Sequence, residues 1–266
     1  MSSATPPLRL LLPHVEDLPV DEAEDRLAAL YTADAPRHVR VNMVQSVDGG
    51  AWGVDGRSGS INDATDWRVF RVLRALADVV LVGAGTARAE GYAALERPRG
   101  LEHLAAAPLE LALVTRTGRV PDGVLEADRT PWVVTGEEGA ERARQDVDAE
   151  HVLVCPEPHV GEPGGVDVTA GIDALAERGL GHVLCEGGPH LLGGLIAAQV
   201  LDDLCVTTTP QVVGSGPSRI VAGPAGPAGT QRPATLAHLL AGPSGTLVAR
   251  WRTTPADRSL PPALAE

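Results

Sequence analysis

The chain has 266 residues, of which 44% are hydrophobic and 21% charged, a balance typical of a globular protein with one large or two small domains. Its 35 acidic and 22 basic residues give a net charge of −13, which argues against non-specific binding to nucleic acid or to anionic membranes. No apolar stretch approaches the roughly 20 residues of a membrane span, and the first residues lack the pattern of a secretion signal. The three cysteines stand singly, as in proteins of a reducing compartment, so we expect a cytoplasmic protein.

Three regions are expected along the chain. Residues 1–38 are predicted to form an N-terminal arm with a short helix from about Asp21 to Tyr31, which has a modest apolar face. Residues 39–255 are predicted to form the main domain, which starts with a strand over Val39–Val47. Residues 256–266 are expected to be a frayed C-terminal tail.

Apolar runs and helical segments alternate through the main domain. Val79–Val82 is continuously apolar and stops at Gly83, which is typical of a parallel strand buried on both faces. Similar runs occur at Leu109–Thr115, Trp132–Thr135, His151–Cys155, His182–Cys185 and Leu204–Thr208. Helices are predicted at Asp66–Ala77, Gly139–Asp146 and Gly171–Arg178, a long loop at Gly214–Pro233, and a last strand at Thr246–Arg252. The alternation predicts an α/β sheet with helices on both faces.

Glu186-Gly187-Gly188-Pro189 is the most informative segment. It follows an apolar strand and opens a helix, where proline fits because the first helical turn leaves its N–H positions unpaired. Gly187 and Gly188 let a ligand approach bare backbone, and the free N–H groups of the helix start suit a pyrophosphate. Glu186 would repel a phosphate, so we expect it to face a second ligand that donates hydrogen bonds. A tight structural turn with a solvated glutamate is the alternative.

Two further strand ends carry residues suited to a nucleotide. Gly83 and Gly85 allow close approach and Thr86 offers a hydroxyl, at a position where open α/β sheets bind ligands. Thr115 and Arg116 belong to a segment with two hydroxyls and two guanidinium groups, which fits a ribose 2′-phosphate. Each segment alone also fits a polar turn, but together they predict NADPH as the cofactor.

Candidates for acid chemistry and for metal binding are few. Asp48 follows the first strand of the main domain at a turn, where an aspartate also commonly caps its own backbone. Cys155 and His159 lie close in sequence but have no second pair at ligand spacing, so we expect no metal.

Short motifs occur in a fixed order along the chain: Ser46-Val47-Asp48-Gly49, Leu73-Arg74-Ala75, Val82-Gly83-Ala84-Gly85-Thr86, Val114-Thr115-Arg116-Thr117-Gly118, Glu186-Gly187-Gly188-Pro189 and Leu201-Asp202-Asp203-Leu204. In this order they resemble the reductase domain of the bifunctional riboflavin-biosynthesis deaminase–reductase, a member of the dihydrofolate-reductase-like superfamily. The resemblance covers about residues 39–252. The chain resembles a stand-alone form of this domain. The deaminase pattern, a His-x-Glu with a later Pro-Cys-x-x-Cys, does not occur in the sequence.

The resemblance implies a three-layer α/β fold with a mixed, mainly parallel central sheet, NADPH as hydride donor, and a homodimer. It also implies a small-molecule substrate, 5-amino-6-(5-phosphoribosylamino)uracil, whose ribosyl group would be reduced. The residues that it assigns to the cofactor are Gly83, Gly85, Thr86, Thr115, Arg116, Gly187 and Gly188. It places Asp48 and Glu186 against the substrate as the catalytic candidates.

The chain departs from the family pattern on the substrate side. A Trp-centred run of the family is replaced by the segment at 57–62, and an Asp-Asp-Pro by Glu90-Gly91-Tyr92. Arg97 and Arg99 are then the candidates to bind a substrate phosphate. Two alternatives stay open: reduction of a pterin such as dihydrofolate, and a protein that binds NADPH without turnover.

Overall fold

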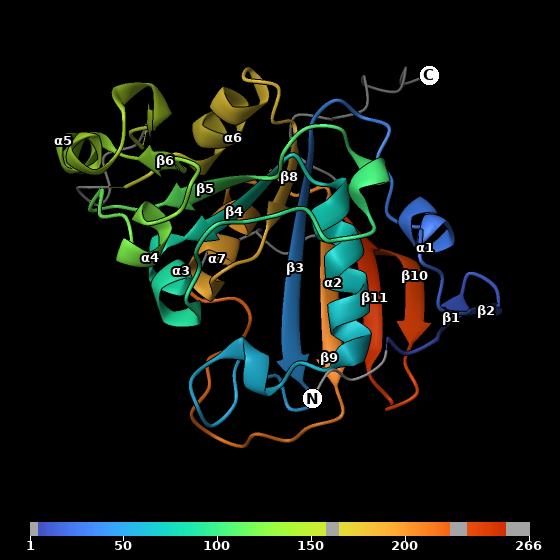
Figure 1. Cartoon of the computed structure of the whole chain (residues 1–266). Helices are drawn as coiled ribbons and strands as arrows, with labels where there is room; N and C mark the ends of the chain where they lie inside the picture. The colour runs from blue at the N-terminus through green and yellow to red at the C-terminus, as the bar shows by residue number, and fades with distance from the viewer. Residues whose placement is uncertain (1–4, 158–164, 224–232, 254–266) are drawn as a thin grey trace, which may run out of the picture.

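The computed structural model describes residues 5–157, 165–223 and 233–253, and its centre is a sheet of eleven strands (Figure 1). The strands are β1 (Leu8–Leu12), β2 (Glu16–Leu18), β3 (His38–Ser46), β4 (Val79–Gly83), β5 (Glu110–Val114), β6 (Trp132–Thr135), β7 (Val152–Val154), β8 (His182–Cys185), β9 (Asp203–Thr209), β10 (Thr235–Ala241) and β11 (Leu247–Arg252). Their order across the sheet is β2-β1-β10-β11-β9-β3-β8-β4-β5-β6-β7.

The sheet has a parallel and an antiparallel part. Every pairing from β9 to β7 is parallel, and every pairing from β9 through β11, β10 and β1 to β2 is antiparallel. The predicted α/β class with a mixed, mainly parallel sheet is therefore confirmed. The parallel strands are short and apolar because both of their faces are covered by helices.

Helices cover the sheet on both sides and complete three layers. They are α1 (Asp25–Ala29), α2 (Ala64–Leu76), α3 (Ala84–Glu90), α4 (Asp122–Leu125), α5 (Glu137–Asp146), α6 (Val168–Ala176) and α7 (Pro189–Ala197). Buried residues of α1 to α5 belong to one apolar core, and those of α6 and α7 belong to a second core on the opposite face. The aliphatic composition of both cores follows from the small number of aromatic residues.

Helix α2 is the element that bears most on the site. It begins after Asp63, whose side chain accepts hydrogen bonds from the backbone N–H groups of residues 65 and 66. Val69, Val72 and Leu73 form its buried apolar stripe. The helix ends at Ala77, whose backbone is extended and leads directly into β4.

The predicted N-terminal arm is part of the sheet. Its first residues form β1 and β2, which extend the antiparallel part beyond β10, and the helix there is shorter than predicted. Buried Arg68 of α2 bonds to both carboxylate oxygens of Glu24 and to the carbonyl of Leu18, and so ties this segment to the main domain. Residues 256–266, predicted to be a tail, lie outside the described residues. Within the described ranges the structure contains no helix that is long and apolar enough to cross a membrane.

Candidate functional site

Three predicted ligand segments follow three adjacent strands of the sheet. Strand β4 lies between β8 and β5, and all three run parallel. Their carboxyl ends lead into the turns at 186–188, 83–86 and 115–118, so these turns share one edge of the sheet, called here the carboxyl edge. Parallel α/β sheets bind ligands at this edge because helix N-termini and strand-end turns meet there.

The two glycine turns contact each other directly. The backbone N–H of Gly83 donates to the carbonyl of Gly187 at 2.8 Å. A Cβ atom on Gly188 would lie 2.3 Å from the hydroxyl oxygen of Thr86, so this turn excludes side chains. Gly187 has a φ of +90°, which favours glycine, and Gly85 is exposed with open space around it. Gly187 and Gly188 are buried, so Gly85 is the exposed glycine of the two turns.

The third turn adds a cationic group to the carboxyl edge. Gly83 pairs with Val114 across β4 and β5, so Thr115 and Arg116 directly follow the residue that lies beside Gly83. Thr115 is buried and donates its backbone N–H to β6, whereas the Arg116 side chain is exposed. An exposed guanidinium beside the glycine turns is accessible to the phosphate of a nucleotide.

Glu186 is held by two partners that the sequence did not suggest. Nε and Nη2 of Arg74 donate to its two carboxylate oxygens, each at 2.7 Å, and the hydroxyl of Tyr92 donates to Oε2. The carboxylate is only 3% exposed, against 19% for the Arg74 side chain. Three of the hydrogen bonds that Glu186 can accept are therefore already made, and the guanidinium is the more accessible part of the pair.

The raised pKa values of Arg74 and Tyr92 keep each side chain in one protonation state. Burial disfavours the charged form of Arg74, but the hydrogen bonds and charge of Glu186 outweigh burial and raise the pKa of Arg74. Burial, followed by the negative charge of Glu186, raises the pKa of Tyr92 well above its ordinary value. Tyr92 therefore stays a hydrogen-bond donor and Arg74 a cation at any physiological pH.

Asp48 lies at the carboxyl end of β3 and is bound to a neighbouring loop. Its carboxylate accepts the Ser46 hydroxyl at 2.5 Å and the backbone N–H groups of Gly214 at 2.8 Å and Val213 at 3.2 Å. These bonds, the one from Ser46 first, lower the pKa of the exposed Asp48 carboxyl. Asp48 is thus ionised near neutral pH, which suits orientation of a ligand better than donation of a proton.

The structure does not bring Arg97 or Arg99 to Glu186. The guanidinium of Arg97 donates to the carbonyls of Ala75 and Ala77, both at 2.9 Å, and so caps the C-terminus of α2. Arg99 is exposed, and its carbonyl accepts a hydrogen bond from Arg71. Local sequence could not reveal this, because the carbonyls that bind Arg97 become available only where α2 ends.

The sequence analysis also missed a buried acid on α2. Asp66 is 3% exposed and accepts a hydrogen bond from the hydroxyl of Thr207 on β9. Burial raises the pKa of Asp66 to about 6. Asp66, Phe70 and Arg74 follow each other at four-residue intervals and therefore share one face of α2. The feature that marks Asp66 as a candidate functional residue is its raised pKa. This shift arises from burial, which the fold determines and the local sequence does not show.

Aromatic side chains gather next to Arg74. Its guanidinium carbon lies 4.4 Å from the centroid of Phe70 and 5.9 Å from that of Tyr92. Trp67, which is half exposed, packs against Phe70 with ring centroids 5.4 Å apart. The chain has only seven aromatic residues, so three of them at one place form a local apolar wall suited to a planar ligand.

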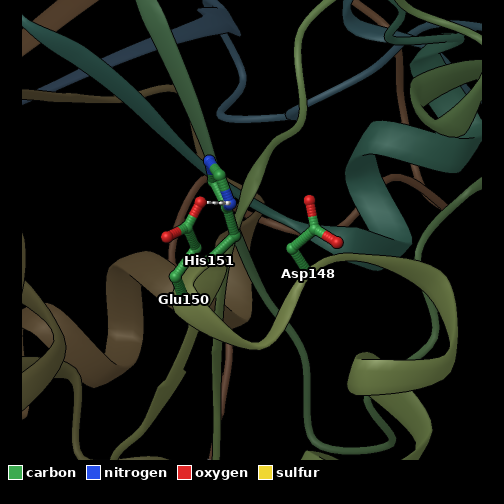
Figure 2. A group of neighbouring side chains, drawn as sticks. All are labelled: Asp148, Glu150 and His151. Atoms are coloured by element: carbon green, nitrogen blue, oxygen red, sulfur yellow. Dashed lines mark ion pairs between the residues drawn. The ribbon is translucent and has the colours of Figure 1, made fainter.

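One possible metal-binding group occurs among the described residues, away from the carboxyl edge. Asp148, Glu150 and His151 bring their ligand atoms within 4.8 Å of one another (Figure 2). Both acids are exposed, and the His151 ring packs against Trp132, so nothing besides proximity indicates an ion. The predicted absence of a metal remains a prediction; Cys155 is a buried free thiol and His159 lies outside the described residues.

Two hollows in the structure contain none of the predicted site residues. One, of about 270 Å³, lies between the segments 124–131 and 144–148, and the other, of about 170 Å³, lies at the amino ends of β3 and β8.

The class that this fold defines is an α/β protein with a mixed, mainly parallel sheet, in which ligands generally bind at the carboxyl ends of the parallel strands. The chain belongs to the RibD C-terminal domain family, whose model matches residues 37–248. The predicted family resemblance is thereby confirmed, and the family places the chain among oxidoreductases. Among curated proteins, no sequence matches the chain.

Several solved structures share the fold. A pyrimidine reductase-like protein of Corynebacterium diphtheriae is 22% identical with a TM-score of 0.71, and the match covers 88% of this chain and 99% of that one. The deaminase/5-amino-6-(5-phosphoribosylamino)uracil reductase of Thermotoga maritima is 18% identical with a TM-score of 0.61, over 82% of this chain and 56% of that one. The riboflavin biosynthesis reductase Rib7 of Saccharomyces cerevisiae is 17% identical with a TM-score of 0.58, over 88% and 100%.

Proposed function

We propose that this chain is an NADPH-dependent reductase of 5-amino-6-(5-phosphoribosylamino)uracil, acting in riboflavin biosynthesis. Membership of the RibD C-terminal domain family carries the proposal. The carboxyl edge supports it, because two glycine turns and an exposed arginine lie at the ends of three adjacent strands. The Thermotoga and yeast proteins of the same fold are reductases of this pathway.

The residues of the carboxyl edge fit a dinucleotide. The backbone of Gly83, Gly187 and Gly188 would take the pyrophosphate, since Gly188 is the N-cap of α7, where backbone N–H groups have no partner within the helix. Thr86 would contribute its hydroxyl, and Arg116 would bind the 2′-phosphate. NADPH supplies a hydride when bound. The protein would align the substrate through the Arg74–Glu186 pair and Asp48, and would exclude water from the reacting carbon.

The test is a panel of substrates followed by NADPH absorbance. The proposal expects oxidation of NADPH with the ribosylaminouracil phosphate at a higher kcat/KM than with dihydrofolate. Faster turnover of dihydrofolate would assign the chain to pterin reduction. Binding of NADPH without oxidation by any pyrimidine or pterin would make it a non-catalytic nucleotide-binding protein.

Pterin reduction is the second candidate, and one observation favours it. Asp66 is a buried acid with a pKa near 6 on the same helix face as Phe70 and Arg74. Such a carboxyl can accept ring N–H groups or hold a proton near neutral pH, as a reducible heterocycle requires. Trp67 and Phe70 offer an apolar surface for an aromatic tail, and donors of Arg97, the predicted phosphate ligand, bond to carbonyls at the end of α2.

Arg116→Ala is expected to weaken NADPH binding by about tenfold or more and to leave NADH binding unchanged. The reason is the loss of charge-assisted bonds to a 2′-phosphate, worth roughly 1.5–3 kcal/mol each. Fluorescence titration with both cofactors measures the effect, and Arg144→Ala on α5 is a control. Equal weakening of both cofactors would contradict the assignment of Arg116 to the 2′-phosphate.

We also propose a homodimer located in the cytoplasm. The dimer rests on the family resemblance, and the location is supported by three free, buried thiols. Light scattering at micromolar concentration is expected to report about twice the chain mass of 27.6 kDa, and a mass near 27.6 kDa would exclude the dimer. Cell fractionation tests the location.

A further inference from the structure

Around Glu186, the free hydrogen-bonding groups are donors of Arg74, because most of the acceptor capacity of Glu186 is already used. Arg74 uses Nε and Nη2 on the carboxylate, and among the described residues its Nη1 has no hydrogen-bond partner. Glu186 is almost fully buried and accepts three hydrogen bonds. A ligand that reaches this group therefore meets spare donors on Arg74 before it meets a spare acceptor on Glu186.

Tyr92 contributes to this difference because its hydroxyl occupies an acceptor position of Glu186. Without its hydroxyl, Oε2 of Glu186 would keep a free acceptor position in a nearly dry environment, which costs free energy unless a ligand or water fills it. The hydroxyl also holds the carboxylate from a second element, because Tyr92 follows α3 whereas Arg74 lies on α2. The carboxylate is thus clamped by residues from two elements.

Aromatic packing holds the cation in the same clamp. The guanidinium of Arg74 lies over the ring of Phe70 at 4.4 Å and that of Tyr92 at 5.9 Å, so two aromatic rings contact the cation. Rotation of Arg74 away from Glu186 would require loss of these contacts together with the two charged hydrogen bonds. The confinement leaves Nη1 as the part of the guanidinium that is free to bind a ligand.

We propose that Tyr92 is a positioning residue: its hydroxyl clamps the Arg74–Glu186 pair so that the site presents the Arg74 donors to a hydrogen-bond acceptor of the substrate, such as a carbonyl or phosphate oxygen. The role of this pair in substrate binding rests on the proposed function. The clamp itself does not, because it consists of contacts within the chain.

The clamp is testable without any substrate. Tyr31 and Tyr92 are the chain's only tyrosines, so Tyr31→Phe leaves Tyr92 as the single phenol whose ionisation is visible in near-ultraviolet absorbance. Tyr92 is expected to ionise well above its ordinary pKa in this variant. Adding Glu186→Gln removes the negative charge and should lower the pH at which Tyr92 ionises. An unchanged titration would overturn the clamp, and circular dichroism at each pH identifies the folded range.

The positioning role is tested by kinetics. Tyr92→Phe is expected to raise the KM for substrate about tenfold, with kcat and the Kd of NADPH within about twofold, because the change affects ligand binding and not the reacting atoms. Tyr31→Phe is the matched control, since the hydroxyl of Tyr31 has no hydrogen-bond partner among the described residues. A fall in kcat at unchanged KM would overturn the positioning role.

The two failures are distinguishable. If the wild-type chain oxidises NADPH with no pyrimidine and no pterin, the proposed function fails, while the phenol titration still decides whether Tyr92 clamps Glu186. If turnover is present but Tyr92→Phe behaves as wild type, the proposed function stands and the inference about Tyr92 is refuted.

Discussion

Glu186→Gln is expected to raise the KM for substrate by about ten- to a hundredfold and to leave the Kd of NADPH within about twofold. The carboxylate binds Arg74 through two charge-assisted hydrogen bonds of 2.7 Å. A glutamine has one oxygen and one NH2 group, so one of these bonds must be lost and two donors would face each other. Each lost bond to a charged group costs roughly 1.5–3 kcal/mol. The cofactor would be spared because it is expected to contact the backbone of Gly187 and Gly188.

Steady-state kinetics measure the KM for substrate, and titration measures the Kd of NADPH. Glu177→Gln is the matched control, because Glu177 is exposed at the end of α6, which leads to the amino end of β8, whereas Glu186 follows the carboxyl end of that strand. Urea unfolding of both variants monitors the folded state. Loss of NADPH affinity in Glu186→Gln would place the carboxylate on the cofactor, and unchanged kinetics would remove it from substrate binding.

Much of the parallel part of the sheet could be predicted from the sequence because β4, β6, β7 and β8 are short and mainly apolar runs. The predicted boundaries of β6 and β8 match the structure, since a polar or glycine residue follows each run. Strands β1, β2 and β10 were not predicted. They lie in the antiparallel part, where alternating exposure gives a weaker apolar signal, and β2 spans only three residues.

Helix α3 was also missed, for a different reason. The segment Val82-Gly83-Ala84-Gly85-Thr86 was interpreted as a ligand loop because its glycines allow close approach at the end of a strand. A helix starts within it, since Ala84 and Ala87 are both buried and Ala87 belongs to the apolar core. A ligand turn and a helix start are compatible here, because Gly83 is the N-cap.

The partners of the charged residues could not be predicted. Arg74 and Glu186 are separated by 112 positions, and nothing in either local segment indicates the other. The interpretation of Glu186 as an acceptor for substrate N–H groups assumed a free carboxylate, whereas the structure shows it bound to Arg74 and Tyr92. Asp66 was overlooked because an acid in the first turn of a helix is usually explained by the helix dipole.

Asp66→Asn is expected to stabilise the fold by up to about 3 kcal/mol above pH 7 and to have no effect on stability near pH 4. Burial raises the pKa of Asp66 to about 6 from its ordinary value of 3.8. The folded state therefore binds the proton more tightly than the unfolded state. Between these two values stability falls as the pH rises, and above pH 6 the fold carries the full cost of a buried charge. An asparagine avoids this cost and can keep a hydrogen bond with Thr207.

Urea unfolding at pH 4.5 and pH 8 measures the difference, and Asp128→Asn, at an exposed position, is the control. Equal effects of Asp66→Asn at both pH values would show that this carboxyl does not titrate between them. Activity then separates two roles of Asp66. If Asp66 has only a structural role, the more stable variant keeps its turnover. If it binds or protonates a heterocycle, turnover falls although stability rises, and the pH dependence near 6 disappears from kcat/KM. A gain in stability with a loss of activity is the pattern expected where a fold tolerates a buried charge because the reaction uses it.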